Sequence, residues 1–395
     1  MECRSKVINV RQRGEGRCSL VTDEVVSAVG DVLSKSSSES SSSSSGLALF
    51  FLLDPVEGAS LSLNENSDPS VRSDLSKAAL KVCPTDPMLR RLTFGSRSLV
   101  IPINSGRLSV GTWQGFYLCD WRETADGAAS FTISVTVLTN PSAAVIQSTF
   151  QPPSRGFHSM RSIASSLLLK NQSKSSSSSS PSSSTSSTAT SEVNDGLACV
   201  MVRHCSASMA FLEDNRALCD LERALSLLVP DKWSKWFEHN YEGWDDMPGH
   251  AKNALIGGPC VLVPITSDSH LVLSDMEDVG FGEHRDDWGR YGRSMSVTRL
   301  PGSFRGSDMI PMTTPPATAS TSSTSSTSTT GGGGFKWGME FSASSFNPKV
   351  SNGFVRLCGP NLSCFVVAQA GLNGQTMWKS LSLIHISEPT RLLRS

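Results

Sequence analysis

The sequence predicts two tandem, divergent copies of one α+β domain, each with mixed or antiparallel β-sheets packed against a few helices. The first observation is length, because 395 residues suffice for two or three domains. The second is a series of short motifs that recurs in the same order about 150 residues further along the chain. The third is a serine-rich tract that precedes the first motif of both series. A period of this length indicates duplication of a whole domain and not a solenoid of short repeats.

The motif series starts with Gly46-Leu47-Ala48 in copy one and Gly196-Leu197-Ala198 in copy two. The further matches are Ala59-Ser60 with Ala207-Ser208, Ile101-Pro102-Ile103 with Val263-Pro264-Ile265, Asp120-Trp121-Arg122-Glu123 with Glu283-His284-Arg285-Asp286, and Ser134-Val135-Thr136 with Ser296-Val297-Thr298. Chance would rarely keep this order. We therefore assign residues 1–140 to copy one and residues 141–300 to copy two.

Caps and helical spacing predict two helices in copy one. Thr22 can cap the first, in which Val25, Val29 and Val32 share one face. The second follows Asp68-Pro69, an acidic cap before a first-turn proline. Its apolar face consists of Val71, Leu75, Ala78 and Val82.

Copy two contains the counterpart of the second helix and one further helix. The apolar face of the counterpart consists of Leu218, Leu221, Leu225 and Leu228, and Pro230 ends it. Asp245 or Asp246 can cap a short helix that has Pro248 near its start and Gly257-Gly258 at its end.

Three segments have strand patterns. Phe131, Ile133, Val135 and Val137 alternate with polar neighbours, which is the period of a half-buried strand. Residues 99–103 and 261–265 are short apolar runs typical of buried strands.

Several segments are expected to lie outside the folded domains. Serine-rich inserts at 34–45 and 172–193 cannot bury enough apolar surface to fold, so we predict disorder there. Residues 301–334 form a low-complexity linker, and residues 335–380 a tail without a clear pattern. Residues 381–395 include a string that looks like a translated sequencing adapter, and we treat them as a gene-model artefact.

Composition narrows the class of protein. The net charge of -1 provides no basic footprint for nucleic acid or an anionic membrane surface. The longest apolar run, Leu47–Leu53, is too short to span a bilayer, and no secretory signal follows Met1–Arg11. The ten cysteines are scattered without a C-x-x-C pair, which favours reduced thiols. We therefore expect a cytoplasmic protein without a nucleic-acid or membrane partner.

All six histidines outside the adapter-like segment lie in copy two, so any imidazole chemistry must come from that copy. His204 follows an apolar strand, and His239 and His250 flank an acidic turn. Three neutral imidazoles suit a divalent metal such as zinc with an open fourth position. The carboxylates of the turn, which can orient an imidazole or act as a base, are Glu242, Asp245 and Asp246. The alternative is a surface His239 beside a solvated acidic turn.

Copy one contributes two candidate binding segments. One is Asn64-Glu65-Asn66, and the other is the glycine-rich run 106–115 with Arg107, Trp113 and Gln114. Glycines let the backbone approach a ligand, and arginine can hold a phosphate through two hydrogen bonds. On residue types alone, a tight hairpin with Trp113 in the core is the favoured alternative.

These strings resemble the YjbQ-like family (uncharacterised protein family 0047). The family has three motifs in order, which read roughly H-T-S-A-S-L-x-x-N-E-N, H-x-x-E-G-x-D-D-M-P-x-H and I-P-I-x-x-G-R-L-x-x-G-T-W-Q-G. The resemblance covers about residues 7–138 and 146–300 without the serine inserts. Copy one lacks the histidine of the first motif, at Val56–Ser60, and the whole second motif. Copy two lacks the N-E-N string, at Phe211–Asn215, and the tryptophan hairpin. Each copy therefore retains what the other has lost.

The resemblance implies a trimer-forming fold with motif residues near subunit boundaries, so we predict one composite site between the two copies. With the resemblance we also expect a small-molecule substrate and a pseudo-dimer or a higher self-assembly. It also implies thiamine-phosphate synthase activity, which joins a pyrimidine diphosphate to a thiazole phosphate and expels pyrophosphate. Carried over, His204, His239 and His250 would hold a metal or transfer protons, with Glu242, Asp245 and Asp246 orienting them. The substrate pocket would be shaped by Asn64, Glu65, Asn66, Arg107, Trp113 and Gln114. The alternatives are a non-catalytic binding or scaffold protein with a decayed site, and a metal-dependent hydrolase.

Overall fold

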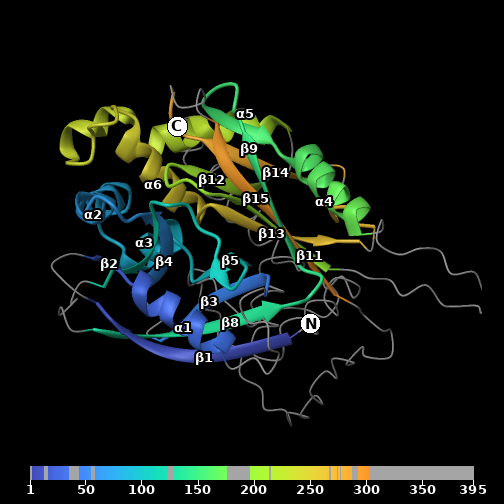
Figure 1. The fold of residues 1–395 in the computed structure, drawn as a ribbon. Helices are drawn as coiled ribbons and strands as arrows, with labels where there is room; N and C mark the ends of the chain where they lie inside the picture. Colours follow the sequence, from blue (N-terminus) through green and yellow to red (C-terminus); the bar gives the residue numbers. More distant parts are fainter. Residues whose placement is uncertain are drawn as a thin grey trace, which may run out of the picture.

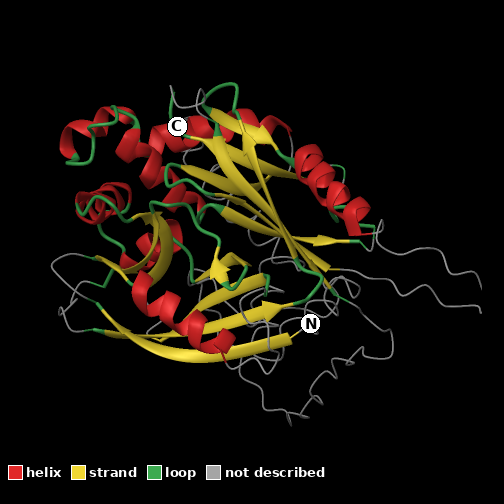
Figure 2. Ribbon diagram, in the orientation of Figure 1, coloured by secondary structure: helices red, strands yellow, loops and turns green. Residues whose placement is uncertain are grey.

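The computed structural model of the chain describes residues 2–12, 17–34, 44–54, 58–122, 129–175, 196–212, 215–266, 268–273, 275, 277–286 and 292–302. The predicted linker, tail and adapter-like segment lie outside these residues, apart from the first two linker positions. Most of both serine-rich inserts also lies outside them. Figure 1 shows copy one in blue to teal and copy two in green to orange, with α6 beside α2 and α3. Figure 2 shows the strands of both halves in yellow, gathered into sheets, with the helices in red packed against them.

The described residues of copy one form two antiparallel sheets and three helices. The larger sheet has the order β1 (Glu2–Arg11), β8 (Ser130–Thr139), β3 (Gly46–Asp54), β5 (Ser98–Asn104) and β6 (Arg107–Leu108). The smaller sheet has the order β2 (Cys18–Leu20), β7 (Gln114–Asp120) and β4 (Ala59–Glu65). The helices are α1 (Thr22–Ser34), α2 (Ser70–Val82) and α3 (Pro87–Thr93).

Copy two repeats this arrangement. Its larger sheet has the order β13 (Cys260–Ile265), β11 (Gly196–Val202), β15 (Arg293–Pro301) and β9 (Ala144–Phe150). Its smaller sheet has the order β10 (Gly156–Ser159), β14 (Asp278–Glu283) and β12 (Ala207–Leu212). The helices are α4 (Arg161–Ser175), α5 (Asn215–Leu228), the 3-10 helix η3 (Asp231–Trp236) and α6 (Asp246–Ile256). Because α4 runs to Ser175, the first residues of the insert predicted at 172–193 are helical.

Strand register confirms the duplication. Ala48 pairs with Ile101 on one side and Val137 on the other, and Ala198 pairs with Val263 and Arg299 at the matching positions. Gly46 and Gly196 begin the central strands of their sheets. A Cβ at either position would clash with a carbonyl oxygen of the neighbouring strand. Both copies therefore keep glycine where two backbones approach closely.

The predicted strands and helices are present, and their starts show two differences. Helix α1 begins at Thr22, but the Thr22 hydroxyl accepts a hydrogen bond from the Phe116 amide 3.0 Å away in β7. Helix α6 begins at Asp246, and Asp245 makes no side-chain cap because its carboxylate contacts Arg285 and Asp286. In both cases a tertiary partner takes the oxygen that local sequence assigned to a cap.

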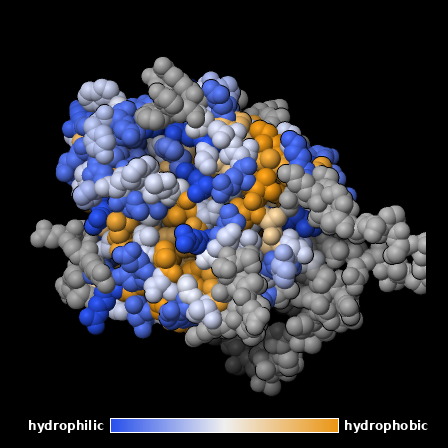
Figure 3. Space-filling view, in the orientation of Figure 1, coloured by the Kyte–Doolittle hydropathy of each residue, from blue (hydrophilic) through white to orange (hydrophobic). Residues whose placement is uncertain are grey.

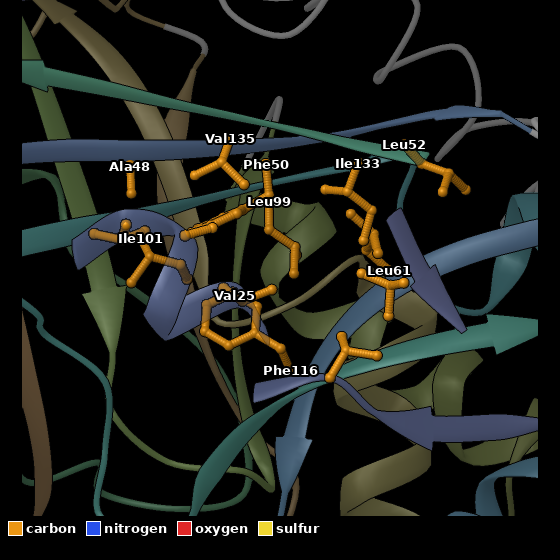
Figure 4. Close-up of a cluster of buried hydrophobic side chains, with 14 of the residues drawn as sticks. Val25, Ala48, Phe50, Leu52, Leu61, Leu99, Ile101, Phe116, Ile133 and Val135 are labelled. Atoms are coloured by element: carbon orange, nitrogen blue, oxygen red, sulfur yellow. The ribbon is translucent and has the colours of Figure 1, made fainter. Parts of the chain in front are cut away.

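The core of copy one lies between α1 and its sheets. Figure 4 shows Val25, Phe50, Leu61 and Phe116 pointing toward one another in this cluster. The rings of Phe50 and Phe116 meet edge to face with centroids 4.9 Å apart. Met201 of copy two is part of the same cluster, so the core extends across the boundary between the copies.

A second apolar cluster is shared by both copies. Copy one contributes side chains from α2, such as Leu75, and from the smaller sheet, together with Phe94 and Trp121, which directly follow α3 and β7. Copy two contributes Val229, Phe237 and Met247, which are all buried. By contrast, on the face drawn in Figure 3, hydrophilic residues cover much of the described surface and hydrophobic ones form separate patches. The two copies are therefore joined by two apolar clusters, each of which contains side chains of both copies.

Candidate functional site

One cluster of possible metal ligands lies at the junction of the copies. Glu65, His239 and His250 each place one ligand atom within 4.8 Å of the other two. Glu65 is the last residue of β4 in copy one, and His250 lies on α6 of copy two. His239 lies between η3 and α6, and its ring centroid is 5.0 Å from that of His250. We call Glu65, His239, His250 and the adjoining Asp246 the composite centre.

Copy one sets the tautomer of both imidazoles. The Nδ1 of His239 is 2.6 Å from the Asp68 carboxylate, and the Nδ1 of His250 is 2.7 Å from the Asn64 Oδ1. Both oxygens accept hydrogen bonds, so each Nδ1 carries a hydrogen, and in the neutral form of each ring Nε2 is the nitrogen available to a cation. The Asn64 orientation is fixed because its Oδ1 also accepts from the Glu65 amide and its Nδ2 donates to the His250 carbonyl.

The free Nε2 atoms face carboxylates. The Nε2 of His250 is 3.4 Å from Glu65 Oε2, and the Nε2 of His239 is 3.7 Å from the same oxygen. Asp246 Oδ2 is 3.2 Å from the His239 Nε2, and both atoms are buried without a hydrogen-bond partner among the described residues. Two acceptors this close repel each other unless a proton or a cation lies between them. A bound cation would satisfy both atoms.

Arg285 organises the acidic turn. Its guanidinium is 2.8 Å from Glu242, 3.3 Å from Asp245 and 2.8 Å from Asp246. Burial alone would raise the pKa of Asp246, but the hydrogen bond and charge that His250 supplies when it is protonated, and then the charge of Arg285, lower it overall. Of the three predicted carboxylates, only Asp246 contacts the histidines. Glu242 and Asp245 contact Arg285 instead, which corrects the expectation that all three orient imidazoles.

His204 is not a member of the centre. Its Nε2 is 2.7 Å from the Arg293 Nη1, and a guanidinium can only donate, so this lone pair is taken. Its Nδ1 lies 3.2 Å from the Ser206 hydroxyl. Burial, and then the positive charge of Arg293, lower the pKa of His204 well below its ordinary value. The predicted set of three imidazoles is therefore replaced by two imidazoles and Glu65.

The glycine-rich segment of copy one contacts copy two. Gln114 donates from Nε2 to the His204 carbonyl at 3.0 Å, and its Oε1 accepts from the Gly111 amide at 2.8 Å. A Cβ at Gly111 would lie 2.5 Å from the Arg203 carbonyl oxygen. Gly111 therefore lets the backbone of copy two approach closely. From the sequence, a ligand was expected at this place.

The remaining predicted binding residues are more dispersed. Trp113 is 61% exposed, which excludes the alternative that it lies in the core. The Asn66 amide donates to the Trp113 carbonyl at 2.8 Å, so these two residues lie beside each other next to Glu65. Arg107 is exposed on β6, where it pairs with Asn104, and forms no hydrogen bond or ion pair with the centre among the described residues.

From the sequence, Asp68 was expected only to cap a helix, and Arg285 had no expected role. Asp68 does both tasks, because its Oδ1 accepts from the Ser70 amide at 2.8 Å while Oδ2 contacts His239. The signal for Arg285 lies in the repeat. Its counterpart Arg122 binds Asp120, whereas the matching carboxylate of copy two, Glu283, is bound by Arg293. Arg285 is thereby left to contact the acidic turn.

A second buried polar network lies beside the composite centre. The Glu222 carboxylate is 2.6 Å from the His284 Nδ1 and 2.9 Å from the Lys252 Nζ, and His284 Nε2 is 2.9 Å from the Ser208 hydroxyl. His284 and Lys252 are fully buried. Burial alone would raise the pKa of Glu222, but the charges and hydrogen bonds of His284 and Lys252 lower it below its ordinary value.

This network predicts acid sensitivity. A carboxyl group with a lowered pKa in the folded state contributes stability that is present above its unfolded pKa, 4.5, and is lost as the pH falls below that value. We expect the free energy of unfolding to decrease below this pH. The slope of the free energy of unfolding against pH measures the number of protons taken up on unfolding. In Glu222→Gln this number should be smaller by up to about one proton. Denaturant titrations at a series of pH values measure both slopes, and parallel curves would contradict the assignment.

Fold and site together define a class: a duplicated α+β protein with one carboxylate–imidazole centre built from both copies. The family model described as "UPF0047 protein YjbQ-like" matches residues 6–139 and 180–301. The chain therefore belongs to the YjbQ-like UPF0047 family and contains two copies of its domain.

Individual relatives each match a part of the chain. The UPF0047 protein YjbQ of Escherichia coli is 32% identical over 116 residues, which cover 26% of this chain and 77% of that protein. The UPF0047 protein YugU of Bacillus subtilis is 35% identical over 89 residues, covering 20% and 65%. A solved structure of a YjbQ/UPF0047 family protein from Clostridium acetobutylicum covers 34% of this chain and 99% of that one, with 25% identity and a TM-score of 0.27. Among the described residues, no helix has the length and apolar character needed to cross a membrane.

Proposed function

We propose that this chain is a metal-dependent enzyme whose composite centre binds one divalent cation, with zinc as the expected ion. The observation that carries the proposal is the pair of imidazole Nε2 lone pairs that face Glu65 and Asp246 while both Nδ1 atoms are held by copy one. Two histidines and a glutamate form a catalytic zinc ligand set that leaves a position for substrate. In metal-ligating histidines, the ring nitrogen that does not bind the metal typically donates a hydrogen bond to an oxygen, as both Nδ1 atoms do here.

The residues around the centre have separable tasks. A bound divalent cation would polarise a substrate oxygen and offset the charge of an anionic leaving group. Asp68 and Asn64 keep both rings in the ligating tautomer. Asp246 forms an ion pair with Arg285, and it is placed to accept a proton beside the cation. Trp113 is exposed next to the centre and offers a ring face to a substrate.

The reaction we propose is the one implied by the family resemblance, a thiamine-phosphate synthase-type transfer that expels pyrophosphate. A cation centre supports a reaction with such a leaving group. A non-catalytic scaffold with a decayed site is the alternative. Reciprocal decay alone would not keep Asn64 and Asp68 of copy one hydrogen-bonded to His250 and His239 of copy two. A metal-dependent hydrolase would use the same centre with water in place of the second substrate.

Two measurements test the proposal. Elemental analysis of the purified chain should find about one zinc ion per chain. Expression in a thiamine-requiring microbe that lacks its own synthase should restore growth, and the matched His250→Ala chain should not. Absence of growth with well-folded, metal-loaded protein would reject the transferase, and release of pyrophosphate from the pyrimidine diphosphate alone, with water as the acceptor, would favour the hydrolase.

A further inference from the structure

Asp74 of α2 connects copy one to the backbone that carries His239. Its Oδ2 accepts hydrogen bonds from the Glu238 amide at 2.7 Å and from the His239 amide at 2.8 Å. Its Oδ1 accepts from the Lys77 Nζ at 2.8 Å. Asp74 is fully buried. A buried carboxylate is costly unless its partners satisfy it, and here two amides and an ammonium do so.

His239 needs such support because it lies outside a regular element. It belongs to the segment between η3, which ends at Trp236, and α6, which begins at Asp246. Asp68 holds its ring, and Asp74 holds its backbone. Asp68 lies two residues before the first residue of α2 and Asp74 lies within α2, so both carboxylates belong to one short stretch of copy one. The position and the orientation of this imidazole are therefore set by that stretch.

We propose that Asp74 is a positioning residue for the composite centre, which fixes His239 at the distance from Glu65 and His250 needed for joint ligation. This inference rests on the proposed metal centre. It adds a requirement that the ligands alone do not impose. The Asp74 carboxylate of α2 must keep its hydrogen bonds to the backbone of the segment that contains His239. Loss of one supporting contact behind a ligating histidine typically weakens metal affinity about 10- to 100-fold.

The test compares Asp74→Asn and Asp74→Ala with Asp120→Asn in the full chain. Asp120 is a matched control, because it is also a fully buried carboxylate of copy one but pairs with Arg122 at 2.7 Å. Zinc affinity by competition with a chelator should fall about 10- to 100-fold in both Asp74 variants, and the absorption bands of the cobalt-loaded protein should shift. Asp120→Asn should lower the melting temperature while zinc affinity stays at the wild-type value. Equal affinities in the Asp74 and Asp120 variants would overturn the proposal.

A second readout does not depend on metal. Amide hydrogen exchange in the peptide 237–241 of the metal-free chain should be faster in Asp74→Asn than in wild type, since the two amides lose their acceptor charge. Exchange at the wild-type rate would overturn the positioning role whatever the metal results. A wild-type chain that binds no zinc, with faster exchange in Asp74→Asn, would instead reject the proposed function and leave the backbone contact established.

Discussion

Replacing His250 with alanine is expected to weaken zinc binding by about three orders of magnitude. Zinc binding is worth about 10–16 kcal/mol in small structural sites, and one of three protein ligands accounts for roughly a third of it. Glu65→Gln, on the other copy, should have a comparable effect because Glu65 Oε2 lies 3.4 Å from the His250 Nε2. Chelator competition and elemental analysis of the purified variants measure the loss.

The control for this prediction is His204→Ala. The Nε2 of His204 accepts a hydrogen bond from Arg293, so replacing His204 with alanine should leave the zinc content unchanged. Trp113→Ala should match His250→Ala in loss of substrate binding or activity while keeping the metal, because Trp113 is exposed beside the centre. Zinc lost in His204→Ala but kept in His250→Ala would show that the ligand set is assigned incorrectly.

Neither copy is expected to fold when it is expressed alone. Copy two buries Val229, Phe237 and Met247 in a cluster with side chains of copy one. Burial of a large apolar side chain contributes about 1.5–3 kcal/mol, so these three represent roughly 5–9 kcal/mol. A typical domain is stable by only about 5–15 kcal/mol. Separation would remove this contribution and expose the apolar face of α2.

Circular dichroism and denaturant titration of residues 1–140 and of residues 141–302 test this expectation. Each half should lack a cooperative transition or should aggregate, whereas the two halves expressed together should associate and recover one. A cooperative, monomeric copy one with the stability of the full chain would contradict the shared core.

Much of the fold could be predicted because local patterns and the repeat agree. The alternation of Phe131, Ile133, Val135 and Val137 is the buried face of β8, and the matched motifs lie at matched register in both halves. Reciprocal loss also predicted that residues of both copies share a site, and Glu65 does lie beside His239 and His250. These inferences depend on spacing and order, which a sequence states directly.

The choice of partner could not be predicted in the same way. His204, His239 and His250 look equivalent in the sequence. In the structure, Arg293 of β15 donates a hydrogen bond to His204, whereas His239 and His250 face the carboxylates of Asp246 and Glu65. That outcome depends on which side chains of distant strands meet. Thr22 likewise has the chemistry of a cap, and its hydroxyl binds β7 instead. Tertiary competition for a hydrogen bond has no local signature.

The junction between the copies has a consequence for how a complete centre forms. When the contributors to a site lie on separate chains, the fraction of complete sites falls on dilution. Here the contributors are tethered, and a tethered partner is present at an effective concentration of about millimolar. Assembly is intramolecular, so the number of centres follows the number of chains at any expression level. The tether also removes the need for either copy to keep both sets of residues, because a residue missing from one copy is always supplied by the other.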